Sequence, residues 1–224
     1  MTYDGYTKYD AAVAADYEAD RQTEEHWQAE QKFMAEFVTR QPLGRVLDVP
    51  VGTGRFFEFY GSAQEVVGVD ISQHMLQVAA RKAQAQSVRN LSLQEGDATA
   101  LDFPDGHFDS IVCFRLVHLL PPDIVARLFA ELARVSRGRL AVQVYAAPQA
   151  KSGLGQTLRA IGSRLLKPLR PAAAPSPWSH IQSYAHTSQF LLGSAQAAGL
   201  KLVNHQVLCR YGRDSVDVIE LEKC

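Results

Sequence analysis

The chain has 224 residues, enough for one compact domain and short for two. Apolar residues make up 46% and charged residues 21%, and this ordinary globular composition excludes a disordered or fibrous protein. The three cysteines are widely spaced, so neither a disulfide framework nor a cysteine-built metal site is expected. The chain contains no apolar run of about 18 residues, so no membrane span is predicted. The start MTYDGYTKYD does not resemble a signal peptide. We therefore expect a cytoplasmic protein.

The formal net charge of −1 conceals an uneven distribution along the chain. Residues 1–131 hold 20 acidic and 11 basic residues, whereas residues 132–213 hold 11 basic residues and no acidic one. Two explanations stay open: folding mixes these charges with the acidic half, or the basic region faces an anionic substrate or surface.

The N-terminal part, residues 10–39, has apolar residues at helical spacing and predicts one or two helices. Short apolar runs then predict five strands: Arg45–Val49, Glu65–Asp70, Leu91–Gln94, Phe108–Phe114 and Leu140–Tyr145. Helices are predicted between them, at Phe56–Tyr60, at 73–86 after the N-cap Ser72, and at Asp123–Val135. This alternation indicates a parallel sheet with helices on both faces.

The C-terminal part follows a different pattern. A helix is predicted at Ser188–Ala198, followed by strands Leu200–Leu208 and Ser215–Glu222 around the turn at 211–213. So short a connection fits an antiparallel hairpin. We expect a single domain 1–224, in which 1–42 form N-terminal helices, 43–145 the core, 146–178 a basic, proline-rich insertion, and 179–224 the C-terminal helix and hairpin.

The Gly-rich turn after the first strand brings backbone N–H groups and a helix N-terminus together. Asp70 ends the next strand, 22 residues after Asp48, where a carboxylate can accept the ribose hydroxyls of an adenosine ligand. Asp48 lies just before the turn, and its charge would repel a pyrophosphate but attract an ammonium group. This favours a cofactor other than a dinucleotide.

VLDVPVGTGRF resembles the first motif of class I S-adenosylmethionine-dependent methyltransferases, in which an acid precedes a Gly-rich turn. VVGVDIS, followed by LQEGDATALDFPDGHFDSIVC, continues the resemblance, which covers about residues 43–145 and agrees more weakly near the C-terminus. It implies a Rossmann-like, doubly wound, mostly parallel seven-stranded sheet with a C-terminal antiparallel hairpin, and S-adenosylmethionine as cofactor. Pro50 stands where the commonest pattern has glycine.

The resemblance also implies which residues contact the cofactor: Asp48, Pro50, Gly52, Gly54, Asp70, Ile71, Met75, Asp97, Ala98 and, by a looser match in DYEADR, Tyr17. Five of them also have a simpler explanation. The glycines can merely form a tight turn, Asp70 can cap the following helix, Asp97 can bond within its own loop, and Met75 can be a core residue. No metal is expected, because no His/Cys/Asp cluster has ligand spacing.

The acceptor is expected beyond the carboxyl ends of the strands. For a hydroxyl acceptor, His118 and His180 are the candidate general bases, although a histidine among apolar neighbours, as in FRLVHLLPP, is more often a packed residue. Tyr145 and Tyr184 are candidate substrate contacts. Arg115 is predicted to bind an acceptor carboxylate or phosphate, or else to pair with an acid of the N-terminal helices.

A methyltransferase acting on a small molecule, saccharide or lipid-linked acceptor is the favoured function. A nicotinamide-dependent oxidoreductase is disfavoured, because Phe57 stands at the third glycine position and no Tyr-x-x-x-Lys pair is present. A nucleic-acid substrate is disfavoured because FRLV replaces an (Asn/Asp)-Pro-Pro-(Tyr/Phe) motif. A catalytically silent binding module is the third alternative.

Residues 154–170 predict a short basic amphipathic helix, with Leu154, Leu158, Ile161 and Leu165 on one stripe. Either this helix is a lid that packs on the domain, or it also meets an anionic partner: a phosphorylated or lipid-linked acceptor, or a membrane surface contacted peripherally.

Overall fold

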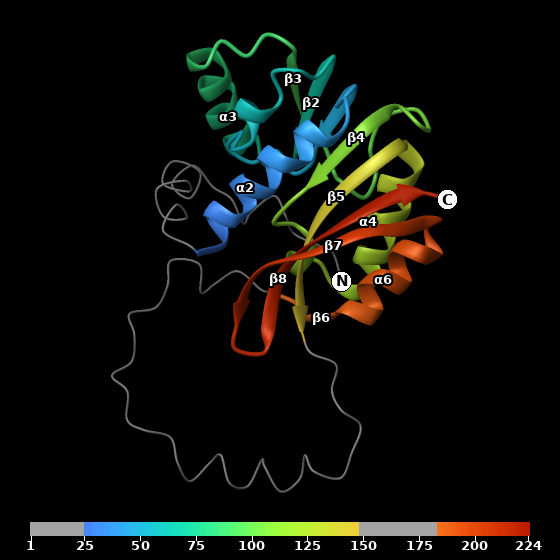
Figure 1. Ribbon diagram of the computed structural model, residues 1–224. Coiled ribbons are helices and arrows are strands. Elements are labelled where there is room, and N and C mark those ends of the chain that lie inside the picture. Colours follow the sequence, from blue (N-terminus) through green and yellow to red (C-terminus); the bar gives the residue numbers. More distant parts are fainter. Residues whose placement is uncertain (1–24, 148–182) are drawn as a thin grey trace, which may run out of the picture.

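The computed structural model describes residues 25–147 and 183–224, and the elements are labelled in Figure 1. The helices are α2 (Glu25–Arg40), α3 (Gln73–Ala85), α4 (Pro122–Val135) and α6 (Ser188–Ala197), with short 3₁₀ turns at Phe57–Phe59 and Val117–Leu119. The strands are β1 (Arg45–Asp48), β2 (Glu65–Asp70), β3 (Leu91–Glu95), β4 (Phe108–Cys113), β5 (Ser136–Ala147), β6 (His186–Thr187), β7 (Leu200–Tyr211) and β8 (Asp214–Lys223).

All eight strands of the described ranges join one sheet. Seven follow the order β3-β2-β1-β4-β5-β8-β7, and the two-residue β6 pairs in parallel with β5. Strands β1 to β5 are parallel, whereas β8 is antiparallel to both β5 and β7. The expected doubly wound sheet with an antiparallel C-terminal hairpin is therefore confirmed. The strand order reverses between β1 and β4, which is where such sheets open a crevice for ligands.

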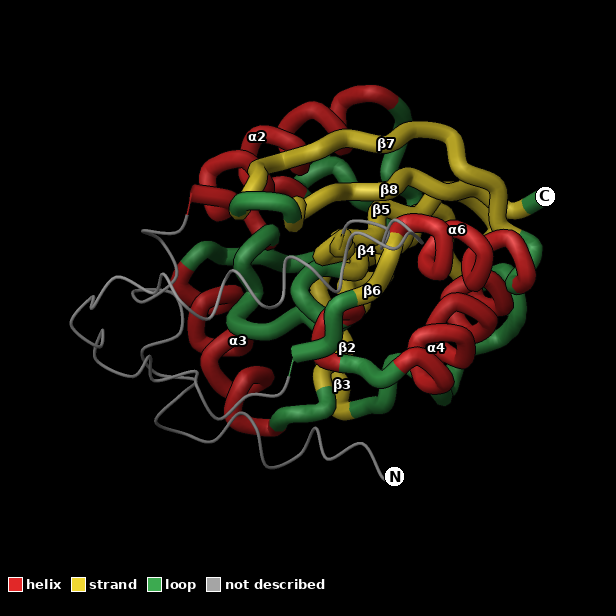
Figure 2. The backbone as a smooth tube through the Cα atoms, turned by 90° about the horizontal axis from the view of Figure 1, so that it is seen from below, coloured by secondary structure: helices red, strands yellow, loops and turns green. Residues whose placement is uncertain are grey.

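Helices cover both faces of the sheet, with α2 and α3 on one side and α4 and α6 on the other (Figure 2). The alternation of strand side chains produces these two layers. In β1, Val46 packs with α2 and α3, and its neighbour Leu47 packs with α4 and α6. Helix α4 contributes Val125, Leu128, Phe129 and Leu132, all fully buried, at the spacing of one helical face.

The structure differs from the sequence expectations at several element ends. Residues 56–60 form only a 3₁₀ turn, β7 runs on to Tyr211, and β5 extends from Ser136 to Ala147, into the segment expected to be an insertion. Short apolar patterns do not mark where a strand stops, because backbone pairing with β8 continues along β5. The segments 1–24 and 148–182, with Tyr17, His180 and the helix expected at 154–170, lie outside the described residues.

Basic residues of the acid-free stretch pair with acids from the more acidic residues 1–131. Arg134 contacts Asp105 at 2.8 Å and Glu131 at 2.7 Å, and Arg137 contacts Asp109 at 2.6 Å. For these positions, folding mixes the charges. Over the described ranges, none of the helices is long and apolar enough to cross a membrane.

Candidate active site

The turn after β1 uses its two glycines differently. Gly54 has φ +78°, and a Cβ there would lie 2.1 Å from Phe57 Cε2, so no larger residue fits without displacing that ring. Gly52 has φ +55°, but a Cβ there would meet no atom within 4 Å, because this residue borders a cavity. Gly54 therefore shapes the turn, and Gly52 keeps space open beside it.

Asp70 ends β2 and is almost completely buried. Its carboxylate accepts the backbone N–H of Gly52 and that of Ser72, both at 2.9 Å. Ser72, and not Asp70, is the N-cap of α3, since its hydroxyl accepts the Met75 N–H at 3.3 Å. Asp70 thus links the Gly-rich turn to the start of α3, and it borders the cavity.

The cavity lies at the carboxyl ends of β1, β2 and β4. The residues lining it include all the predicted cofactor contacts of the first two motifs except Gly54: Asp48, Pro50, Gly52, Asp70, Ile71 and Met75. A neighbouring hollow shares Pro50, Asp70 and Ile71 with it and adds Asp97 and Ala98. Asp97 also accepts the N–H and hydroxyl of Thr99 at 2.8 and 2.9 Å, so it bonds within its own loop as well.

The two carboxyl groups of the cavity are held in a poorly solvated place. Burial raises the pKa of Asp48 from 3.8 to about 7, although the Tyr60 hydroxyl donates to it at 2.9 Å and opposes the shift. Burial also raises the pKa of Asp70 from 3.8 to about 6, although hydrogen bonds from backbone N–H groups to its carboxylate lower the pKa and oppose this shift. Buried carboxylates of this kind gain most from a ligand that brings positive charge or hydroxyl donors.

These residues fit a nucleoside cofactor with a cationic end. Asp70 has further acceptor positions for ribose hydroxyls, Asp48 suits an ammonium or sulfonium charge, and Gly52 leaves the space that a side chain would fill.

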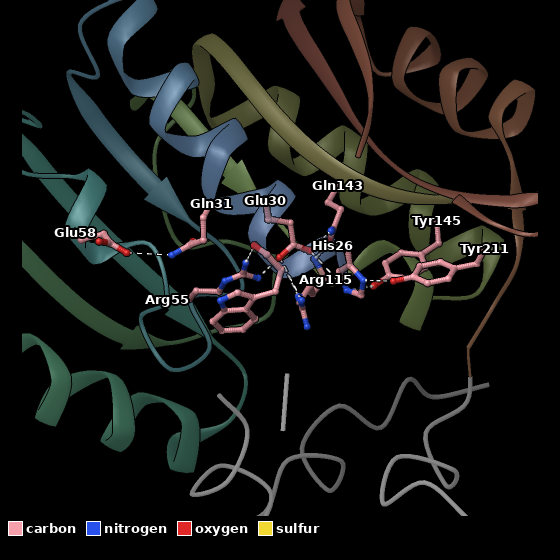
Figure 3. A network of polar contacts seen from close by, with 10 residues as sticks. His26, Glu30, Gln31, Arg55, Glu58, Arg115, Gln143, Tyr145 and Tyr211 are labelled. Carbon is pink, nitrogen blue, oxygen red and sulfur yellow. Dashed lines mark hydrogen bonds and ion pairs between the residues drawn. The ribbon is translucent and has the colours of Figure 1, made fainter. Parts of the chain in front are cut away.

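A second cluster includes two arginines that line the cavity, Arg55 and Arg115, and apart from one interpretation of Arg115 it was not predicted from the sequence. Glu30 of α2 is fully buried at its centre and binds Arg55, Arg115 and Gln143 (Figure 3). Arg115 reaches Glu30 Oε2 through Nη2 at 3.2 Å, so its predicted pairing with an acid of the N-terminal helices is present. The only sequence signal for this cluster was a charged residue within the apolar pattern of α2.

Three of the predicted acceptor-side residues, His118, Tyr145 and Tyr184, lie together near the carboxyl ends of β4 and β5. The rings of His118 and Tyr145 are 4.2 Å apart, and the Tyr184 N–H donates to the His118 carbonyl at 2.7 Å. The Tyr145 hydroxyl lies 3.3 Å from His26 Nε2, and the Tyr211 hydroxyl lies 2.9 Å from His26 Nδ1. Within the described parts of the chain, no group of three or more His, Cys, Asp or Glu residues could hold a metal ion.

The fold and the cavity together define a Rossmann-like domain for a nucleoside cofactor. Residues 46–138 match a family model described as a methyltransferase domain. The matched stretch includes the Gly-rich turn, Asp70 and Asp97, so this part of the chain resembles a class I S-adenosylmethionine-dependent methyltransferase domain, a class whose cofactor is S-adenosylmethionine.

The chain is similar to a phosphatidylethanolamine N-methyltransferase of Cereibacter sphaeroides, with 40% identity over 95 residues, 42% of this chain and 46% of the relative. It is 33% identical over 124 residues to the ubiquinone/menaquinone biosynthesis C-methyltransferase UbiE of Shewanella baltica, 53% of this chain and 49% of that one. The match therefore spans about half the length of these curated relatives. Among solved structures, magnesium protoporphyrin IX methyltransferase from Synechocystis PCC 6803 shares the fold, with a TM-score of 0.64 and 19% identity over 89% of this chain and 84% of the other.

Proposed function

We propose that this protein transfers a methyl group from S-adenosylmethionine to a small-molecule acceptor. The observation that carries the proposal is a cavity at the point where the strand order reverses. The buried carboxyl groups of Asp48 and Asp70, at the ends of neighbouring strands, line this cavity together with Gly52, which leaves space where a side chain would lie. The names of the relatives, which include lipid and quinone methyltransferases, support an acceptor of small-molecule or lipid-linked type.

In this proposal the predicted cofactor residues each contact a different part of the cofactor. Asp70 accepts the ribose hydroxyls and Asp48 faces the positive charge, while Pro50, Ile71 and Met75 supply apolar contact. Asp97 and Ala98 contribute the adenine side from the neighbouring hollow. When bound, the cofactor supplies a methyl group on a sulfonium, ready for in-line displacement.

The chain's own residues then position the acceptor and remove a proton where the acceptor is a hydroxyl. His118 is the proposed general base among the described residues, because its ring lies against Tyr145 at the carboxyl edge of β4 and β5. Tyr145 and Tyr184 are the proposed acceptor contacts, with Arg115 on the side of the cavity.

Calorimetric titration with S-adenosylhomocysteine and with NADH tests the cofactor. Binding of S-adenosylhomocysteine alone is expected, and binding of NADH alone would overturn the proposal. Incubation with radiolabelled S-adenosylmethionine and lysate fractions then tests for an acceptor without assuming its class. Transfer of label to a small-molecule or lipid fraction is expected, whereas binding without transfer to any fraction would favour a binding module.

A lipid-linked acceptor would bring the enzyme to a membrane surface. We propose that residues 154–170, whose basic residues and apolar stripe suit an anionic headgroup region, make that peripheral contact. Co-sedimentation with anionic vesicles but not with neutral ones, reversed by high salt, is the expected result. Equal and negligible binding to both would remove the membrane contact.

A further inference from the structure

We propose that the ligand-free protein keeps a proton on Asp48, and that a nucleoside with a cationic end displaces this proton when it enters the cavity. The proposal rests on the proposed function for the nature of that ligand. Asp48 and Asp70 end the paired strands β1 and β2, and both side chains line the cavity. Asp48 is 2% exposed and Asp70 is 4% exposed, so neither carboxyl group is well solvated.

The surroundings of Asp48 compensate a negative charge only weakly. The Gly-rich turn contributes a cation, Arg55, but its Nη1 binds the buried Glu30, and its effect on the pKa of Asp48 is smaller than that of burial. Asp70 adds a second buried carboxyl group. Cys113 of β4 has a thiol whose pKa is raised by burial, so this neighbour stays neutral. Burial of this kind favours the neutral form of a carboxyl group.

Hydrogen bonds distinguish the two carboxyl groups. Asp70 accepts the backbone N–H groups of Gly52 and Ser72, which can only donate and therefore stabilise a carboxylate. Asp48 accepts from the Tyr60 hydroxyl at 2.9 Å. A hydroxyl can donate to a carboxylate or accept from a carboxylic acid, so Tyr60 can serve Asp48 in both protonation states. The same contacts thus assign the proton to Asp48 and the negative charge to Asp70.

A cationic ligand supplies the charge that Asp48 lacks. Its positive end favours the carboxylate, so Asp48 ionises, its proton passes to the solvent, and the Tyr60 hydroxyl continues to donate to it. Because binding releases a proton, affinity must rise with pH until Asp48 is already ionised in the free protein. With a pKa of about 7 in the free protein, the affinity should rise about 10- to 30-fold between pH 5.5 and 8.

Two measurements test the proposal. NMR of the ligand-free protein, labelled with carbon-13 at the aspartate carboxyl groups, follows the titration of Asp48, whose signal is identified by its loss in Asp48→Asn. Calorimetry then measures S-adenosylhomocysteine binding between pH 5.5 and 8 in buffers of low and high ionisation enthalpy, which gives the number of protons released. 5′-Methylthioadenosine is the comparison ligand, because it has the same nucleoside but no ammonium group.

The matched control variant is Asp217→Asn. Asp217 is also 2% exposed, but its carboxylate contacts His205 Nε2 at 2.8 Å, and it does not line the cavity. This variant therefore removes an equally buried carboxyl group that the ligand does not meet.

We expect Asp48 to titrate near pH 7 in the free protein, and S-adenosylhomocysteine to release most of one proton at pH 6. Asp48→Asn should abolish both the release and the rise in affinity, Asp217→Asn should keep both, and 5′-methylthioadenosine should release less. The proposal is overturned if Asp48 titrates near its ordinary pH, if S-adenosylhomocysteine binds without proton release, or if Asp48→Asn still releases the proton. Failure of S-adenosylhomocysteine to bind at any pH refutes the proposed function instead, and the NMR titration then still decides whether Asp48 holds the proton.

Discussion

Replacing Asp48 by Asn should stabilise the ligand-free protein, and increasingly so as the pH rises. Asp48 is 2% exposed, and burial raises the pKa of its carboxyl group from 3.8 to about 7. Asn has nearly the same shape, and its side-chain oxygen can still accept from the Tyr60 hydroxyl, so the main change is the removal of an ionisable group.

The magnitude follows from the two pKa values. Because the folded-state pKa is raised, the folded protein binds more protons than the unfolded chain between about pH 4 and 7, and stability falls as the pH rises through that window. At about 1.4 kcal/mol per pH unit, the ionisation of Asp48 costs about 2 kcal/mol at pH 5 and about 4 kcal/mol at pH 8.5. Asp48→Asn should therefore exceed the wild type in unfolding free energy by about these amounts.

Urea unfolding of both proteins at the two pH values measures the difference. The control is Asp109→Asn, since Arg137 lowers the pKa of Asp109 from 3.8. That carboxylate is ionised in both states at pH 5 and 8.5, so its replacement should destabilise the protein equally at both. The burial argument fails if the advantage of Asp48→Asn is the same at both pH values, or if this variant is the less stable protein at pH 8.5.

Four further predictions concern the ligand and the turn. Asp70→Ala should weaken S-adenosylhomocysteine binding by about 1.5–3 kcal/mol in calorimetry, the scale of a hydrogen bond to a charged group, and unchanged affinity would contradict the ribose role. Gly54→Ala should lower the unfolding free energy by about 2–4 kcal/mol because its Cβ meets Phe57, whereas Gly52→Ala should cost about 1 kcal/mol and mainly weaken cofactor binding; equal losses would refute the distinction. His118→Ala should lower turnover of a hydroxyl acceptor at least about 100-fold while S-adenosylhomocysteine still binds, and near-normal turnover would leave positioning as the source of catalysis. EDTA treatment should leave turnover unchanged, and activity restored by one added metal would disprove this.

The sheet, and the candidate residues at the carboxyl ends of β1 and β2, were predictable because both are local in sequence. Short apolar runs predict the strands. A Gly-rich turn followed by an acid at the end of the next strand predicts a nucleoside site, and these signals lie within about 25 residues of each other. The sequence alone did not distinguish the role of Gly52 from that of Gly54. Only the packed neighbours show that one faces the Phe57 ring and the other faces open space.

The charged cluster around Glu30 depended on tertiary structure. Glu30, Arg55, Arg115 and Gln143 come from four places in the chain, and no spacing relates them. Sequence analysis left Arg115 with two interpretations, and the structure shows the pairing with Glu30, because docking of α2 on the sheet buries that carboxylate where guanidiniums must compensate it. Local patterns thus predicted the fold and the candidate cofactor residues that line the cavity, whereas the charged cluster around Glu30 formed only when distant segments were packed together, since burial and pairing depend on neighbours in space.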